Sequence, residues 1–312
     1  MYESQNKDSL WKPYFDILPS EFDTPMFWND IELNELMGSG VIDKIGKDDA
    51  EKAFNEYLLP IIQAKPSLFD PEVHNLQLFH RMGSLIMSNA FHDDKNQSEE
   101  DEDSGEEDGK KGTDEEARLF REEGLLQMMA IKKISKGEQF NTYGDLCSAD
   151  LLRKYGFVDE NNDHDIVEIN GKLVIDALSV DEDIEKEKVE LLLEEEVLDD
   201  LFVLDTSGEI PPELIITVMM MNKTQFKPVK KTGILPEPVI SIEIIQPLVE
   251  ILEKRLSDYK TSIPEDEEIL KGQNISLRMK YAVMLRLSEK RILQKHIDDL
   301  RSYKVKDDNE EG

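Results

Sequence analysis

The stretch from Lys136 to Asp145 reads KGEQFNTYGD, and the stretch from Asp150 to Val158 reads DLLRKYGFV. Each stretch contains a tyrosine directly before a glycine, and Tyr143 and Tyr155 lie twelve residues apart. Glycine adopts backbone conformations that other residues avoid, and tyrosine combines a rigid ring with a polar hydroxyl. The two stretches therefore predict two aromatic hydroxyls that lie beside tight backbone turns.

Segments with helical periodicity precede and follow these tyrosines. Before them, the pattern predicts helices over 30–36 (with Asp30 as the N-cap), 48–59 and 75–91, a turn at 38–40, and a strand within 124–131. After them, it predicts a pair of strands around an Asn170-Gly171 turn, then helices over 189–202, from Pro212, over 242–259 and over 274–302. We therefore expect an α+β fold whose short strands are followed by a mainly helical half.

The net charge of −32 results from 69 acidic and 37 basic residues in 312. Such a chain repels a phosphate backbone, so we expect no direct nucleic-acid binding, whereas a basic protein is attracted. Solubility is the alternative reason for the acidity. Thirteen of the acids lie between Asp93 and Glu116, where we expect a disordered loop that is either a solvated spacer or a control on access for a basic substrate. The acidic tail from Asp307 is expected to be disordered too.

Membrane, disulfide and metal functions have no support in the sequence. No apolar run approaches about 18 residues, and the first residues do not resemble a signal peptide. A single cysteine, Cys147, precludes an internal disulfide and suits a reducing compartment. The five histidines are scattered without the spacing of a metal site.

The helix predicted over 274–302 has a basic face as well as an apolar one. The basic residues are Arg278, Lys280, Arg286, Lys290, Arg291 and Lys295. Two interpretations remain open. The face either packs against acidic helices of its own domain or is an ordinary solvated surface.

Together, the two tyrosine motifs resemble the C-terminal core of SET-domain protein lysine methyltransferases. The order of elements is similar to the members that carry a Rubisco-methyltransferase-type substrate-binding domain, and Trp11 to Pro19 and Phe27-Trp28 match their mid-SET segment. The resemblance implies a partial SET domain (short β-strands with a helical insert) over 1–165, followed by an all-α substrate-binding domain over 166–312. Within the first, it implies a helical insert over about 25–92, the acidic loop over 93–116 and the C-terminal SET core over 117–165.

The activity that the resemblance implies is methyl transfer from S-adenosylmethionine to a lysine amine. By motif position Tyr143 is the catalytic residue, and Tyr155 and Phe157 line the cofactor and lysine channel. Ser88 and Phe91 match cofactor positions, Asn89 and Asn141 match substrate positions, and Gly144 shapes the turn. Without the resemblance, Tyr155 and Phe157 are more simply explained as core residues.

Three departures from the family pattern affect the cofactor pocket. The N-terminal glycine-rich motif of the family has no counterpart here. A block that contains the family's asparagine motif is missing between Glu116 and Ala117. The segment Gln139 to Asn141 is one residue shorter than the corresponding family motif. A one-residue change shifts strand register. The sequence therefore predicts a methyltransferase that is impaired as it stands, with a non-catalytic protein-binding module or an incomplete sequence as alternatives. By family, the substrate is a basic, ribosomal protein, the chain is a monomer, and its location is the nucleus or cytoplasm.

Overall fold

The computed structural model describes residues 1–89, 117–122, 125–130, 133, 135, 143–178, 182–221 and 223–303. The chain forms two compact units. The first contains Met1–Phe22 and Glu51–Leu146, and the second contains Asp23–Ala50 and Cys147–Gly312. The segment 93–116 and the acidic tail, for which disorder is predicted, lie outside the described residues. Phe91 and Asn141 lie outside them too.

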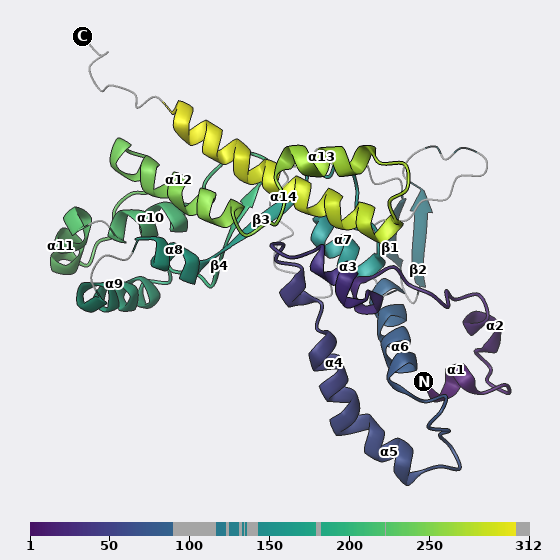
Figure 1. Cartoon of the computed structure of the whole chain (residues 1–312). Coiled ribbons are helices and arrows are strands. Elements are labelled where there is room, and N and C mark those ends of the chain that lie inside the picture. The colour runs from purple at the N-terminus through teal and green to yellow at the C-terminus, as the bar shows by residue number, and fades with distance from the viewer. Residues whose placement is uncertain are drawn as a thin grey trace. The chain divides into compact units, whose positions relative to one another are not determined.

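The first unit consists of short helices and one β-hairpin (Figure 1). Its elements are α1 (Tyr2–Gln5), α2 (Lys12–Phe15), the π-helix η3 (Phe54–Leu58), α5 (Leu59–Ala64), α6 (Leu76–Asn89), β1 (Ala117–Glu122) and β2 (Leu125–Ala130). Helix α4 (Lys47–Ala53) contains the boundary between the units. Strands β1 and β2 pair antiparallel from Ala117 opposite Ala130 to Glu122 opposite Leu125. This strand β2 confirms the strand predicted within 124–131.

Proline explains the π-helical turn in this unit. Pro60 lies near the start of α5, directly after η3. Because proline has no backbone N–H, it cannot donate to the carbonyl four residues earlier, and a local widening of the helix accommodates the loss. Phe54, at the start of η3, is buried and packs against Phe79 of α6 with ring centroids 5.7 Å apart.

The second unit contains a two-stranded sheet and a larger set of helices (Figure 1). Its 3₁₀ segments are η1 (Pro25–Phe27) and η2 (Ile42–Lys44), and its strands are β3 (Ile166–Asn170) and β4 (Leu201–Asp205). Its helices are α3 (Asp30–Asn34), α7 (Ser148–Tyr155), α8 (Gly171–Leu178), α9 (Glu182–Glu194), α10 (Pro212–Met221), α11 (Lys223–Thr232), α12 (Ile242–Leu256), α13 (Ile263–Lys271) and α14 (Leu277–Ser302).

Strands β3 and β4 form one side of the main apolar core. They pair antiparallel, and Val167 lies opposite Leu204 and Ile169 opposite Phe202. All four side chains are buried, since alternate residues of a strand point to the same face of a sheet. They pack against buried residues of α8, α10, α12 and α14, and Figure 1 shows α12 lying along α14.

Two smaller apolar clusters complete the second unit. One joins Trp28, Leu36 and Val41 to Leu152 of α7 and to Leu285 of α14. The other lies between α9, α10 and α11, where Leu192, Met220 and Phe226 are buried. The first of these clusters fixes α7 and the residues that follow it.

Several sequence predictions about this unit are wrong. The range 166–312 is mainly helical but not all-α, because β3 and β4 lie within it. Asn170-Gly171 is not a hairpin turn, because Gly171 begins α8 and β3 pairs with β4, thirty residues later in the chain. The helix predicted over 189–202 ends at Glu194, since Glu196 has a left-handed φ of 55° and Leu201 begins β4. In addition, the N-cap of α3 is Asn29, whose side chain accepts hydrogen bonds from Ile31 N and Glu32 N, and not Asp30.

The fold class is confirmed as mixed helix with few strands. The remaining helix predictions correspond to α3, α4, α6, α10, α12 and α14. Among the described residues, no helix is both long enough and apolar enough to cross a membrane. The division at residues 165 and 166 stays a prediction.

Candidate functional site

Helix α7 carries the second tyrosine motif and is held at both ends. At its start, the N-cap residue Cys147 makes no side-chain capping hydrogen bond. The buried Asp165 takes that role, because its Oδ1 accepts a hydrogen bond from Ser148 N at 2.6 Å. A carboxylate at this end of a helix is also favoured by the helix dipole. Asp165 Oδ2 in turn accepts a hydrogen bond from the Ser288 hydroxyl of α14, so α7 is tied to α14.

Gly156 ends α7 in the left-handed conformation, with φ 82° and ψ 26°. Its N–H donates to the carbonyls of Leu151 and Leu152, at 3.1 and 3.0 Å. A Cβ atom at this position would lie 2.9 Å from backbone atoms of Asp23 and Thr24. Glycine is therefore required twice, for its φ and for the close approach of a neighbouring chain segment.

Tyr155 and Phe157 lie on either side of this glycine and form an aromatic pair. Their ring centroids are 6.3 Å apart, with 41° between the ring planes. Both are half-buried, whereas Leu152 and Val158 beside them belong to the apolar core. Leu152 and Val158 are core residues, whereas the two alternatives for Tyr155 and Phe157, core packing and channel lining, stay predictions.

Tyr143 belongs to the first unit and has 38% of its surface exposed. The next residue, Gly144, has a left-handed φ of 73°, and its carbonyl accepts a hydrogen bond from Leu146 N at 2.9 Å. The prediction of tight glycine turns beside both tyrosines is therefore confirmed. Tyr155 and Phe157 belong to the second unit, so the surroundings of Tyr143 and those of this aromatic pair are described unit by unit.

Ser88 and Asn89 lie at the end of α6 and bond within their own turn. The Asn89 amide donates to the Leu85 carbonyl at 2.9 Å and to the Ser88 hydroxyl at 3.2 Å. The Ser88 hydroxyl donates to the same carbonyl at 3.4 Å. Both side chains therefore bond to the backbone of the last turns of α6. The cofactor and substrate roles of Ser88, Asn89, Phe91 and Asn141 stay predictions.

A buried network around Glu289 was not predicted from the sequence. Glu289 on α14 accepts hydrogen bonds from the hydroxyls of Ser39 at 2.7 Å and Tyr259 at 2.8 Å. Arg255 donates to the Tyr259 hydroxyl at 3.2 Å and to the Glu168 carbonyl at 2.8 Å. Burial raises the pKa of Glu289 to about 7, against the hydrogen bonds that lower it. The sequence feature that could have indicated this network is an acidic residue, Glu289, on the apolar face of the helix α14.

The Glu289 network borders a small cavity. The cavity has a volume of about 190 Å³ and is lined by Lys44, Arg153, Glu168, Glu289 and Cys147, among others. Lys44 forms an ion pair with Glu168, and Arg153 forms one with Asp150. Burial raises the pKa of the Cys147 thiol, which disfavours the reactive thiolate.

The basic face of α14 pairs with acidic residues of its own unit. Asp266 is fully buried and accepts hydrogen bonds from Arg286 at 2.7 Å and from Lys290 at 2.5 Å. Burial pushes the pKa of Asp266 up, but the bonds from Arg286, Lys290 and Thr261 outweigh it and hold that pKa below its ordinary value. Arg278 reaches Glu32 and Lys280 reaches Glu160, at 3.0 and 3.1 Å. Arg286 and Lys290 therefore pack against an acidic residue, whereas Lys280, Arg291 and Lys295 are solvent-exposed, so each interpretation holds for part of this face.

No group of three or more histidine, cysteine or carboxylate side chains among the described residues is placed to hold a metal ion.

The fold and the two tyrosine motifs can now be compared with known proteins. Residues 181–293 match a family model described as Rubisco LSMT substrate-binding. A solved structure of Rubisco LSMT bound to AdoMet shares the fold with a TM-score of 0.66 at 22% identity, and the match covers 96% of this chain and 72% of that one. A structure of the SET domain of LSMT bound to lysine and AdoHcy matches with a TM-score of 0.64. The chain thus shares its fold with Rubisco LSMT, and its residues 181–293 are similar to the substrate-binding domain of that family.

Individual relatives are named N-lysine methyltransferases. The N-lysine methyltransferase setd6 of Danio rerio is 27% identical over 95% of this chain and 76% of the relative. The corresponding SETD6 of Bos taurus is 26% identical over 96% and 76%. That of Xenopus tropicalis is 33% identical over 51% of this chain and 38% of the relative. The predicted resemblance to protein-lysine methyltransferases, and to ribosomal lysine N-methyltransferase 4 and SET-domain-containing protein 6 among them, is confirmed for the family and for the second of these proteins.

Proposed function

We propose that this chain is an S-adenosylmethionine-dependent protein-lysine N-methyltransferase. The observation that carries the proposal is the α7 motif. Its C-terminal glycine and buried anchors hold Tyr155 and Phe157 half-exposed, within a fold that matches lysine methyltransferases over 96% of the chain.

The aromatic pair fits the cofactor chemically. When bound, S-adenosylmethionine supplies a sulfonium that carries the methyl group. The faces of Tyr155 and Phe157 are suited to a cation, and both side chains are half-buried. By motif position, the Tyr143 hydroxyl orients the lysine amine, and Gly144 sets the turn that presents it.

The substrate that we propose is a basic protein, and by resemblance a ribosomal one. The net charge of −32 favours a basic partner and disfavours direct contact with nucleic acid. We further propose that the chain acts as a monomer in the nucleus or cytoplasm. The missing block before Ala117 and the shortened motif at Gln139 to Asn141 lead us to propose that its activity is lower than that of relatives with complete motifs.

A non-catalytic protein-binding module is the second candidate. The observation that favours it is the location of the cores. The three apolar clusters formed by described residues all lie in the second unit, which includes the region that matches the substrate-binding model. Such a unit could recruit a partner without methyl transfer.

Titration calorimetry of the whole chain with S-adenosylmethionine separates the two candidates. For the enzyme, we expect saturable binding that Tyr155→Ala weakens and Tyr143→Phe leaves in place, because the Tyr143 hydroxyl is assigned to the amine. Tyr143→Phe should instead lower methyl transfer to a basic protein. Tyr303→Ala, an exposed tyrosine after α14, is the control and should change neither. A folded sample that releases no heat would favour the module.

A further inference from the structure

Strand β4 has one edge that faces away from its partner β3. In an antiparallel pair, residues whose backbone groups bond to the partner strand alternate with residues whose N–H and C=O groups point away from it. Gly171 lies opposite Asp200 in the register of this pair, and its N–H donates to the Asp200 carbonyl at 2.8 Å. Counted in twos from that bonded pair, Leu201 and Val203 direct their backbone groups away from β3.

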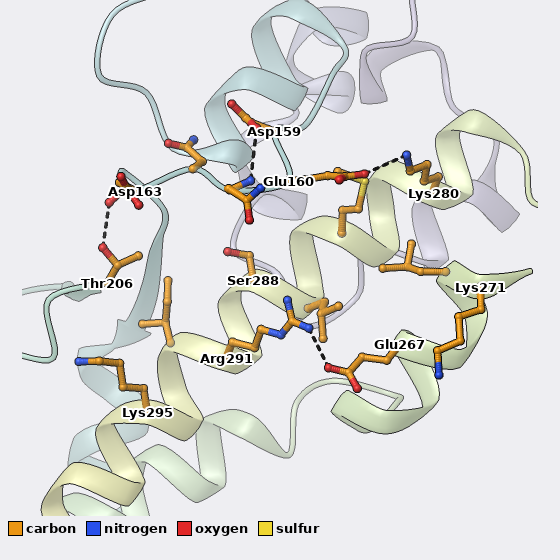
Figure 2. A pocket seen from close by; sticks show the side chains of 16 residues that line it. Asp159, Glu160, Asp163, Thr206, Glu267, Lys271, Lys280, Ser288, Arg291 and Lys295 are labelled. Carbon is orange, nitrogen blue, oxygen red and sulfur yellow. Dashed lines mark hydrogen bonds and ion pairs between the residues drawn. The ribbon is translucent and has the colours of Figure 1, made fainter. Parts of the chain in front are cut away.

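The opposite edge of the sheet is already bonded, which supports this count. Glu168 lies opposite Val203, so its carbonyl points away from β4, and Arg255 Nε donates to that carbonyl at 2.8 Å. On the β4 edge, none of the described residues bonds to the outward backbone groups. Thr206, directly after β4, bonds toward the β3 side instead, since its hydroxyl donates to the Asp163 carbonyl at 2.9 Å (Figure 2). In the part of the chain that the structure describes, the β4 edge is therefore open.

The side chains along the open edge suit an extended peptide. Leu201 and Val203 are 41% and 43% exposed, whereas Phe202 and Leu204 between and beyond them are buried in the main core. An added strand places apolar side chains beside the two exposed ones, as cross-strand neighbours on one face of the sheet. Free backbone groups supply affinity in this mode of binding, and alternate side chains supply specificity.

Acidic residues at both ends of β4 indicate which segment fits. Asp199 and Asp200 precede the strand, Asp205 ends it, and all three are exposed. Hydrogen bonds from Ser207 lower the pKa of Asp205, so its carboxylate stays charged at neutral pH. If two β4 strands paired antiparallel about Val203, Asp205 of each copy would lie close to the acids that precede the strand in the other. Like charges, in a chain of net charge −32, thus disfavour a second copy and favour a segment with basic ends.

We propose that the open edge of β4 binds an extended segment of a basic protein, which adds an antiparallel strand to the sheet. Its apolar side chains lie beside Leu201 and Val203, and its basic side chains lie at the acidic ends of β4. The edge belongs to the region 181–293 that matches the substrate-binding model. The identification of the bound protein as the substrate rests on the proposed function, but the binding itself needs no cofactor.

The test is fluorescence anisotropy of the whole chain with a labelled peptide Lys-Lys-Val-Thr-Val-Lys-Lys, without cofactor and at about 0.15 M salt. Two N-methylated forms of the peptide are compared. Methylation of both valine nitrogens removes the N–H groups that face β4, because the valines lie opposite Leu201 and Val203, and we expect Kd to rise about tenfold. Methylation of the threonine and of the lysine directly before the first valine removes N–H groups that face away, and it should change Kd less than about threefold.

Protein variants locate the site. Asp199→Asn with Asp200→Asn removes two charges at one end of β4 and should raise Kd about fivefold. Glu243→Gln with Glu250→Gln is the matched control, because these exposed glutamates of α12 change the net charge equally, and it should change Kd less than about twofold. Val203→Pro removes an N–H that does not bond to β3, so it should raise Kd about tenfold and keep the far-ultraviolet circular dichroism of the wild type.

A peptide with glutamate in place of lysine should not bind. The proposal is overturned if the two N-methylated peptides bind equally, if the two double variants weaken binding equally, or if folded Val203→Pro binds the peptide as well as the wild type does. Sedimentation velocity tests the other occupant. A wild-type dimer that Val203→Pro dissociates would assign the edge to a second copy and would overturn the proposal too. Because cofactor is left out, failure of the methyltransferase assignment would not alter these results.

Discussion

At the scale of the residue, Gly156 combines a left-handed φ of 82° with backbone atoms of Asp23 and Thr24 at 2.9 Å from where a Cβ would stand. Gly233 has a similar φ of 67° but no atom within 4 Å of that place. Alanine substitutions at these two glycines therefore separate the free-energy cost of the left-handed backbone from the cost of the steric contact.

Gly156→Ala should therefore destabilise the second unit more than Gly233→Ala. The left-handed conformation alone costs a non-glycine residue about 1–2 kcal/mol, and only the first variant also displaces a neighbouring segment. Urea unfolding of both variants measures the difference. Equal losses would mean that the Asp23–Thr24 segment yields freely.

A second residue-scale prediction concerns Glu289, whose pKa is raised from 4.5 to about 7 by burial. Because the folded state holds the proton more tightly than the unfolded state, this group stabilises the fold most below its unfolded pKa. That contribution is lost as pH rises through about 7. Over the whole interval the loss amounts to about 3 kcal/mol.

Glu289→Gln should remove this pH dependence. Relative to the wild type, the variant should gain stability between about pH 5 and about pH 8, as measured by denaturant unfolding. Glu190→Gln, an exposed glutamate on α9, is the control and should leave the wild-type trend unchanged. If Glu289→Gln follows the wild type at every pH, then the Ser39 and Tyr259 hydroxyls stabilise the charged carboxylate fully.

At the scale of the element, α7 depends on a residue outside it. Asp165 is 3% exposed, and its two oxygens accept from Ser148 N and from the Ser288 hydroxyl. In Asp165→Asn one of these donors loses its acceptor, at a cost of about 1–3 kcal/mol. We expect reduced stability and weaker S-adenosylmethionine binding, since α7 leads to Tyr155.

The matched control for Asp165→Asn is Asp163→Asn, two residues earlier and exposed, which should stay within about 0.5 kcal/mol of the wild type. Ser288→Ala removes one donor but leaves the α7 contact, so cofactor binding should be affected less than in Asp165→Asn. An Asp165→Asn protein that unfolds earlier but binds cofactor normally would limit Asp165 to a structural role.

The sequence predicted those helices and turns whose conformation depends on the local residue pattern. The two Tyr-Gly turns follow from glycine alone, and α10, α12 and α14 follow from apolar periodicity. The hairpin at Asn170-Gly171 was predicted wrongly because β3 finds its partner thirty residues away. Gly171 is needed there because a Cβ would overlap the Asp199 carbonyl. Strand pairing of this kind depends on tertiary contacts that local sequence does not contain.

The same limit applies to the candidate site. The Tyr155 and Phe157 motif was recognisable, but Asp165 and Glu289 act through partners that lie 17 to 250 positions away in the chain. Periodicity also left the basic face of α14 undecided, because a lysine such as Lys290 has the same pattern whether it is solvated or, as here, bonded to the buried Asp266.

At the scale of the whole molecule, the buried apolar residues that the structure describes are unevenly distributed between the two units. The second unit holds the three apolar clusters found among the described residues, while the first contributes Phe54, Ile62, Leu78 and Leu85 as its buried aliphatic and aromatic side chains there. Regions with few buried contacts open at lower free energy than the core of a protein.

Hydrogen exchange should therefore separate the two units. We expect the slowest amides in α12, α14 and β3, whose residues form the main core, and much faster exchange in α5 and α6 under the same conditions. Saturating S-adenosylmethionine is the informative addition. If the enzyme assignment holds, it should slow exchange in α7 and around Tyr143, because a ligand that binds only the folded state stabilises it. Equal protection of α5 and α14 without ligand would contradict the uneven distribution of stability, whatever the cofactor does.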